Sequence, residues 1–194
     1  TTKAGTGYGG YGLDDVDPLD KGVRLWGLSS IAVDKDLTIY LGETGSNYIK
    51  KIYNYDPTDK SKLKIKNIIG NGIKGFTDDK EKASTASIDS PEAIAIDEYK
   101  NSNGNSIKDL YFVDRNNKMI RRVRLEGPNP DDIDKLLTII GNGSWGDTPD
   151  GIIDLPNSPM GDPVGLALDD QGTLYFTEQS GNRIRKIENL RDNN

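Results

Sequence analysis

Thr173-Leu-Tyr-Phe-Thr-Glu178 is the third copy of a stretch that also occurs as Thr38-Ile-Tyr-Leu-Gly-Glu43 and Asp109-Leu-Tyr-Phe-Val-Asp114. The three copies align without a gap, and each ends in an acidic residue. Nine positions after each tyrosine the chain has an isoleucine, at Ile49, Ile120 and Ile184. The same spacing in three copies indicates a repeat architecture, in which each copy forms one structural unit.

Each copy contains further short apolar stretches. One precedes the tyrosine stretch and closes on an aspartate, as Leu28-Ser-Ser-Ile-Ala-Val-Asp34, Pro91-Glu-Ala-Ile-Ala-Ile-Asp97 and Pro163-Val-Gly-Leu-Ala-Leu-Asp169. Another follows the first two copies at 65–69 and 135–140. These stretches are rich in β-branched and aromatic residues and are separated by Gly, Asn, Asp and Pro, so they predict four β-strands per copy. Four antiparallel strands per repeat form the blade of a β-propeller, and the sequence therefore predicts an all-β fold of about three blades.

The repeat boundaries predict the organisation of the chain. We expect an outer-strand remnant and inter-blade loop at 1–27, blade 1 at 28–69, a loop at 70–92, blade 2 at 93–140, a loop at 141–163, and blade 3 at 164–194 without its outer strand. Three blades do not close a ring, because propellers typically have four to eight. We therefore expect further blades or self-association to complete the ring, with residues 1–4 lying where an outer strand ends.

The composition excludes much catalytic chemistry. The 194 residues include no cysteine and no histidine, which removes disulfides, thiol catalysis, the usual zinc ligand sets and Ser-His-Asp triads. The net charge of −6 argues against nucleic acid as a partner, in spite of the basic stretch Arg121-Arg-Val-Arg124. No apolar run reaches the roughly 18 residues of a membrane helix, so we expect no membrane insertion.

The third copy resembles an NHL repeat of the bacterial type. The resemblance lies in Gly165-Leu-Ala-Leu-Asp169, Gly172-Thr-Leu-Tyr-Phe-Thr-Glu178 and Ser180-Gly-Asn-Arg-Ile-Arg-Lys-Ile187, and it extends over nearly the whole chain. It implies a propeller of four-stranded blades. The first copy lacks the proline before its first strand, the second has an insertion around 101–106, and no copy has the histidine of the family's Gly-Asn-His-Arg stretch. The resemblance therefore does not extend to the zinc-holding histidines of NHL-type amidating lyases.

A glycine pattern recurs before each blade. Gly5-x-Gly7-x-x-Gly10 returns at 70–75 and at 141–146, and each formally matches a dinucleotide fingerprint. That fingerprint needs a following helix to hold a pyrophosphate, whereas turn sequences follow here. We expect the glycines to turn the inter-blade loops. The repeated acids Glu43, Asp114 and Glu178 are expected to accept hydrogen bonds from backbone N–H groups in a repeated turn.

The inter-blade loops contain the candidate binding residues. Tyr11, Phe76 and Trp145 have no strand position to explain them, so they either seal a loop onto its blade or contact a ligand. Because these loops emerge on one face of a propeller, we expect the rings to gather there with acids. The candidate metal ligands are Asp14, Asp78, Asp147 and Asp150, which would hold calcium; solvated turn aspartates are the alternative.

These observations favour a non-enzymatic binding or adhesion module whose loops engage a protein or glycan at the cell surface or elsewhere outside the cytoplasm. A calcium-dependent hydrolase or lyase, and a structural spacer in a larger surface protein, are the alternatives. Calcium is the one cofactor that the sequence suggests. The register further predicts that Tyr40, Tyr111 and Tyr175 fill the space between neighbouring blades.

Overall fold

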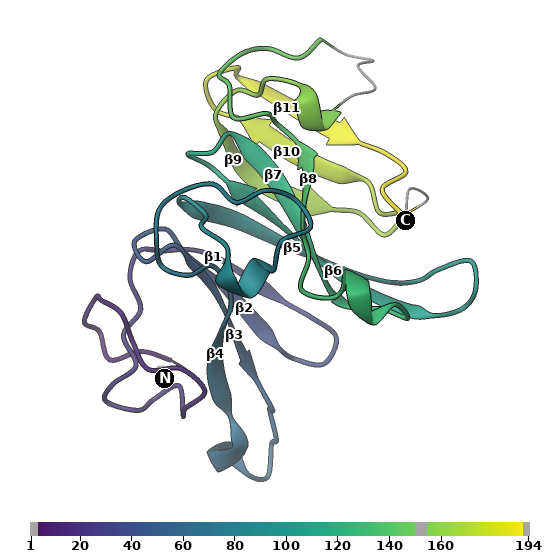
Figure 1. The fold of residues 1–194 in the computed structure, drawn as a ribbon. Helices are drawn as coiled ribbons and strands as arrows, with labels where there is room; N and C mark the ends of the chain where they lie inside the picture. Colours follow the sequence, from purple (N-terminus) through teal and green to yellow (C-terminus); the bar gives the residue numbers. More distant parts are fainter. Residues whose placement is uncertain (1–3, 150–154, 192–194) are drawn as a thin grey trace.

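The computed structural model describes residues 4–149 and 155–191, which form three antiparallel sheets (Figure 1). The first sheet contains β1 (Leu28–Val33), β2 (Ile39–Glu43), β3 (Tyr48–Tyr53) and β4 (Lys64–Ile69). The second contains β5 (Pro91–Lys100), β6 (Ser106–Asp114), β7 (Met119–Glu126) and β8 (Leu136–Ile140). The third contains β9 (Pro163–Leu168), β10 (Leu174–Glu178) and β11 (Arg183–Ile187). The predicted all-β class is confirmed.

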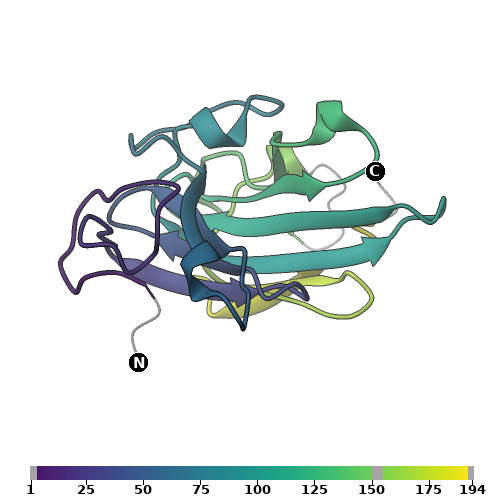
Figure 2. The same ribbon diagram turned by 90° about the horizontal axis from the view of Figure 1, so that it is seen from below.

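Each sheet has the up-and-down strand order of a propeller blade, β1-β2-β3-β4, β5-β6-β7-β8 and β9-β10-β11. We call these sheets blades 1, 2 and 3. The first strand of blade 2, β5, contacts both β1 and β9, so blade 2 lies between the other two (Figures 1 and 2). The helices of the described residues are single 3₁₀ turns, η1 (Lys60–Lys62), η2 (Ala83–Thr85), η3 (Pro130–Asp132) and η4 (Leu155–Asn157). None of them is long and apolar enough to cross a membrane.

The insertion in the second copy lengthens a hairpin. β5 continues to Lys100 and β6 begins at Ser106, so the inserted residues form the turn between two extended strands. Asn101 fixes this turn, because its side-chain oxygen accepts hydrogen bonds from the backbone N–H groups of Asn103 and Asn105, at 3.1 and 3.0 Å. A side chain that bonds to backbone two to four residues ahead is a common way to stabilise such a turn.

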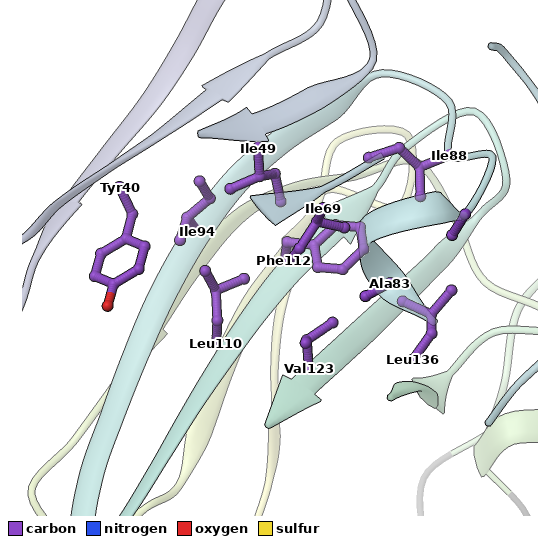
Figure 3. Packing of buried hydrophobic residues seen from close by; sticks show 11 residues of the cluster. Tyr40, Ile49, Ile69, Ala83, Ile88, Ile94, Leu110, Phe112, Val123 and Leu136 are labelled. Carbon is purple, nitrogen blue, oxygen red and sulfur yellow. The ribbon is translucent and has the colours of Figure 1, made fainter. Parts of the chain in front are cut away.

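The core consists of the layers between blades. Between blades 1 and 2, Tyr40 and Ile49 pack against Ile94, Leu110 and Phe112, with Ala83 and Ile88 of the intervening loop closing the layer (Figure 3). Between blades 2 and 3, the layer contains the equivalent residues, which are Tyr111, Ile120, Leu174 and Phe176, with Met160 of the loop. Alternate residues of each strand thus face the preceding and the following blade, as the two-residue period of a strand requires.

The repeated tyrosines differ in burial. Tyr40 and Tyr111 are 3% and 1% exposed and fill the layers between blades as predicted. The prediction is wrong for Tyr175, which is 38% exposed. Tyr175 occupies the same register position, but among the described residues no further sheet follows blade 3 to cover it. Burial at this position therefore depends on the neighbouring blade and not on the strand itself.

The inter-blade loops begin with a common turn. The backbone N–H groups of Gly5, Gly70 and Gly141 donate to the carbonyl oxygens of Pro18, Ala83 and Leu155, at 2.9, 2.9 and 3.1 Å. Gly141 has a φ of 106°, and a Cβ there would lie 2.1 Å from the carbonyl oxygen of Lys118, so only glycine fits. No α-helix follows these turns in the part of the chain that the structure describes. The structural interpretation of the glycine pattern is confirmed.

The N-terminal loop packs on the outer half of blade 1. Val16 and Ile65 of β4 form an antiparallel bridge, and the N–H of Ile65 donates to the Val16 carbonyl at 2.9 Å. Val23 is 1% exposed and packs in a cluster with Leu41 and Ile52, against which Ala4 also lies. The expected outer strand at 1–4 lies, apart from Ala4, outside the described residues.

Candidate functional site

The loops and the blade turns share one edge of the molecule. Leu28 at the start of β1 pairs with Glu43 at the end of β2, so the loop that enters β1 adjoins the β2–β3 turn. The N–H of Thr44 in that turn donates to the carbonyl oxygen of Gly27 at 2.9 Å. The same arrangement recurs in the other blades. We call this edge the linker face: it comprises the described parts of 5–27, 70–90 and 141–162 and the turns 44–47, 115–118 and 179–182.

The three predicted aromatic residues lie on the linker face with exposed rings. Tyr11, Phe76 and Trp145 are 60%, 50% and 62% exposed. Each ring contacts a polar or charged group. The Tyr11 hydroxyl donates to the Gly72 carbonyl at 3.4 Å. The Phe76 ring centre lies 5.2 Å from the Arg121 guanidinium, and the Trp145 ring centre lies 5.3 Å from the Lys118 ammonium, as in cation–π contacts. A ring fixed over a cation on one side presents its other side to solvent.

Contacts across the loops bring successive linkers together. Tyr11 of the first loop bonds to Gly72 of the second, and the side-chain amide of Asn117 donates to the Gly75 carbonyl at 2.8 Å. Asn117 lies in the same turn as Lys118, which lies under Trp145 of the third loop. Among the described residues, the rings of Tyr11 and Trp26 are in contact, with their centres 5.9 Å apart. The aromatic side chains therefore form separate contact points along one face and not a single stack.

Two of the predicted calcium ligands, Asp14 and Asp147, contact protein groups. A carboxylate oxygen of Asp14 accepts a hydrogen bond from the N–H of Asn67 in β4 at 2.6 Å, and Asp147 forms an ion pair with Arg183 at 2.7 Å. Asp78 contributes to the negative potential at Arg121, but its neighbour Asp79 makes the direct contacts, at 3.0 Å to Arg121. Asp150 lies outside the described residues. Calcium binding at these acids stays a prediction.

A carboxylate cluster missed by the sequence analysis lies at the opposite edge of the blades. Asp34, Asp36 and Glu98 have oxygens within 4.8 Å of one another. The ammonium of Lys108 occupies the centre, at 2.9, 3.1 and 3.2 Å from these three carboxylates. Burial disfavours its charge, yet the surrounding acids raise the pKa of Lys108 above its ordinary value. The protein thus supplies its own cation here, and this cation links blade 2 to blade 1.

The repeated acids Glu43, Asp114 and Glu178 anchor the loops. They are 0%, 0% and 1% exposed. Asp114 accepts a hydrogen bond from the N–H of Asp89 at 2.8 Å and Glu178 from that of Gly161 at 2.9 Å, and each donor lies two residues before the first strand of its blade. The expected role as backbone acceptors is therefore confirmed for these two.

The same acids pair with an aligned row of basic residues. Distances of 3.8, 3.7 and 3.8 Å separate Glu43 from Lys50, Asp114 from Arg121, and Glu178 from Arg185. Burial raises the pKa of Asp114 to about 6. Its second oxygen accepts from the side-chain amide of Asn117 at 2.9 Å, so both oxygens have protein partners. The basic stretch of the sequence thus contributes buried internal charges and no continuous basic surface.

A polar cluster connects blades 2 and 3 on the linker face. Arg115 pairs with Glu92 and Asp162, both at 2.8 Å, and Lys118 pairs with Asp162 at 3.2 Å. The guanidinium of Arg115 lowers the pKa of Asp162, with burial acting in the opposite sense. Because Asp162 holds Lys118, and Lys118 lies under Trp145, this cluster positions the exposed indole. No repeated pattern in the sequence indicated it, since Arg115 has no basic counterpart in the other copies.

Comparison with known proteins supports the fold. No protein-family model and no curated protein matches the chain. Solved structures do match: a "putative phosphatase" from Bacteroides thetaiotaomicron is 26% identical over 86% of this chain, with a TM-score of 0.64. A protein of unknown function from the same organism is 18% identical over 78% of the chain, with a TM-score of 0.51. Virginiamycin B lyase from Staphylococcus aureus is 14% identical over 84%, with a TM-score of 0.40.

The chain spans 35% and 32% of the two Bacteroides structures and 42% of the lyase. The three sheets of up-and-down strands define the class of protein, a set of consecutive β-propeller blades, and the two Bacteroides structures share this fold with TM-scores above 0.5. The particular activity is not shown by these matches, because a likeness in fold extends to proteins of unrelated function.

Proposed function

We propose that the chain is an NHL-type propeller segment of an extracellular or cell-surface protein, and that its linker face binds a glycan or a protein without catalysing a reaction. The observation that supports the proposal is the exposure of Tyr11, Phe76 and Trp145, at 60%, 50% and 62%. Rings that merely anchored their loops would turn inward and be buried.

The fixed rings suit recognition for a physical reason. Phe76 and Trp145 are held over Arg121 and Lys118, so a ligand that stacks on them restricts little side-chain motion on binding. Aromatic surfaces beside charged groups bind the C–H faces of sugar rings or the apolar parts of a protein partner. Asp147 lies next to the same loop and remains largely exposed, with 64% of its side chain accessible. A ligand hydroxyl or a basic side chain therefore has a carboxylate within the same surface.

A matched set of variants tests the proposal. Phe76→Ala combined with Trp145→Ala removes two rings of the linker face. Tyr55→Ala removes a ring of similar exposure, 52%, from the β3–β4 connection at the other edge of blade 1. Binding is measured by affinity electrophoresis in gels that contain xylan, mannan, mixed-linkage β-glucan or pectin, and by retention on mucin before and after deglycosylation.

We expect the parent and Tyr55→Ala to bind at least one of these probes, and the double variant to lose binding at an unchanged melting temperature. Loss of mucin retention after deglycosylation assigns the ligand as a glycan, and persistence assigns it as a protein surface. Equal binding by the double variant would refute the role of the rings. If the parent binds none of the probes, the structural spacer becomes the better explanation.

A further inference from the structure

Three Asn-Gly pairs occur in the sequence, at Asn71-Gly72, Asn103-Gly104 and Asn142-Gly143. In such a pair the backbone nitrogen of the glycine can attack the side-chain amide carbon of the asparagine, because the glycine has no Cβ to hinder the approach. Asparagine is therefore among the thermolabile residues of proteins. The three pairs have the same covalent chemistry, so a difference in their reactivity has to come from the fold around each pair.

The pair in the second loop of the linker face is held by hydrogen bonds. The side-chain oxygen of Asn71 accepts a hydrogen bond from the N–H of Ile73 at 2.8 Å. The amide nitrogen of Asn71 donates to the Thr85 carbonyl and to the Ser87 hydroxyl, both at 3.1 Å. The side chain has to leave all three bonds before its amide carbon can meet the backbone nitrogen of Gly72.

The pair in the third loop is held in the same way. The side-chain oxygen of Asn142 accepts a hydrogen bond from the N–H of Ser144 at 2.9 Å, and its amide nitrogen donates to the Asn157 carbonyl at 2.9 Å. Both ends of the amide are thus occupied, as they are in Asn71. The two repeated asparagines fasten their loops, and the same bonds keep their amide carbons away from the following glycine.

The pair at the tip of the β5–β6 hairpin is free of such restraint. The tip projects from blade 2 (Figures 1 and 2), and Asn103 is exposed. Among the residues that the structure describes, its side chain forms no hydrogen bond or ion pair. A Cβ placed on Gly104 would meet no atom within 4 Å, so open space surrounds the pair. One bond restrains the attacking nitrogen, because the Gly104 N–H donates to the Asn101 carbonyl at 2.9 Å. An exposed turn of this kind opens at a small cost in free energy.

We propose that Asn103 is a site of spontaneous modification by water, which converts its amide to an acid, and that the fold protects Asn71 and Asn142 from the same reaction. The Gly104 nitrogen loses its proton and bonds to Cγ of Asn103. The bond from Cγ to the side-chain nitrogen breaks, and this nitrogen takes up a proton and leaves as ammonia. Water then opens the succinimide ring. Cleavage at Cγ gives aspartate, and cleavage at the main-chain carbonyl carbon gives isoaspartate, in which the chain runs through the former side chain.

The modification changes the hairpin and leaves the linker face intact. β5 begins at the linker face with Pro91 and reaches the hairpin at Lys100, so the tip lies at the opposite edge of blade 2. Isoaspartate adds a methylene group to the main chain, in a turn that depends on the bonds of the Asn101 side chain to the N–H groups of Asn103 and Asn105. The site is therefore independent of any ligand bound by the exposed rings.

Incubation of the folded protein in mildly alkaline buffer tests the proposal. Peptide mapping by mass spectrometry, with digestion at acidic pH, gives the converted fraction of each Asn-Gly pair over time. Labelling with a protein isoaspartate methyltransferase counts the isoaspartate formed. The same incubation in urea gives the reactivity of the three pairs without the fold. Asn103→Gln is the matched variant, because the position is exposed and the longer side chain would have to form a less favourable six-membered ring.

In the folded protein we expect Asn103 to react at least about tenfold faster than Asn71 and Asn142, since each of these has to break its side-chain hydrogen bonds first. In urea the three pairs should react at comparable rates, and Asn103→Gln should remove the isoaspartate label from the folded protein. Equal rates at the three pairs of the folded protein would overturn the proposal. So would a folded protein whose Asn103 stays unmodified while the unfolded chain reacts, which is the result expected if the bond from Gly104 to Asn101 keeps the turn closed.

Discussion

Truncating Tyr111 to alanine measures how much the layer between blades stabilises the fold. Tyr111 is 1% exposed and belongs to the cluster shared by blades 2 and 3. Removing a buried aromatic ring costs about 3–5 kcal/mol, from the lost transfer energy and from the cavity that remains. Tyr175→Ala is the matched comparison, because Tyr175 has the same register position but is 38% exposed. With about two thirds of the burial and no enclosed cavity, its loss costs about 1–2 kcal/mol.

Both variants are compared with the parent chain under the same conditions. Urea unfolding followed by far-ultraviolet circular dichroism gives the free energy of unfolding of each protein. For a chain of this size, a cost of 3–5 kcal/mol also lowers the melting temperature by roughly 6–20 °C. If Tyr111→Ala unfolds at the same urea concentration as its parent, or if Tyr175→Ala costs as much as Tyr111→Ala, the assigned layer between blades is wrong.

Three further predictions concern charged groups. Lys108→Ala leaves the buried carboxylate of Asp34 without its cation and should cost about 3–5 kcal/mol in urea unfolding. Added calcium should restore part of this loss, since the acids that surrounded Lys108 lie within 4.8 Å of one another. Calcium bound at that edge should not change the unfolding free energy of the parent, where Lys108 occupies the position. Burial raises the pKa of Asp114 from 3.8 to about 6, so between these pH values the native state binds more protons than the unfolded chain, and the stabilisation from this group should be lost as the pH rises from about 4 to about 6. Asp114→Asn should remove this slope from a plot of unfolding free energy against pH. An unchanged slope would contradict the assignment. Arg191→Met removes the cation of the buried Asp97 and should lower stability more than Lys62→Met, whose ion pair with Asp56 is exposed.

The repeated linear patterns predicted the fold because they reflect local geometry. Alternating apolar residues in strands, and glycines where φ is positive, have the same consequence in each copy regardless of what surrounds it. Gly5, Gly70 and Gly141 show this directly, since each begins its loop with a positive φ, of 81°, 99° and 106°. The backbone-acceptor role of Asp114 was predictable for the same reason, because it depends on a turn that recurs.

The candidate site was predictable only in part. The loop position of Tyr11, Phe76 and Trp145 indicated a shared face, and all three rings are exposed there. The cations beneath the rings were not predictable. Lys118 contacts Trp145 across 27 residues of sequence, and Asp162, which positions Lys118, lies still further along the chain.

The sequence by itself determined the blade count, the strand register and the loops that precede each blade, since these follow from period, residue type and turn chemistry within one repeat. Only the tertiary structure decided what each equivalent position does. Tyr111 is core and Tyr175 is surface, although both have the same local sequence pattern. The physical reason is that a blade buries its faces only against its neighbours, so the burial of a residue such as Tyr111 depends on which blade lies next to it.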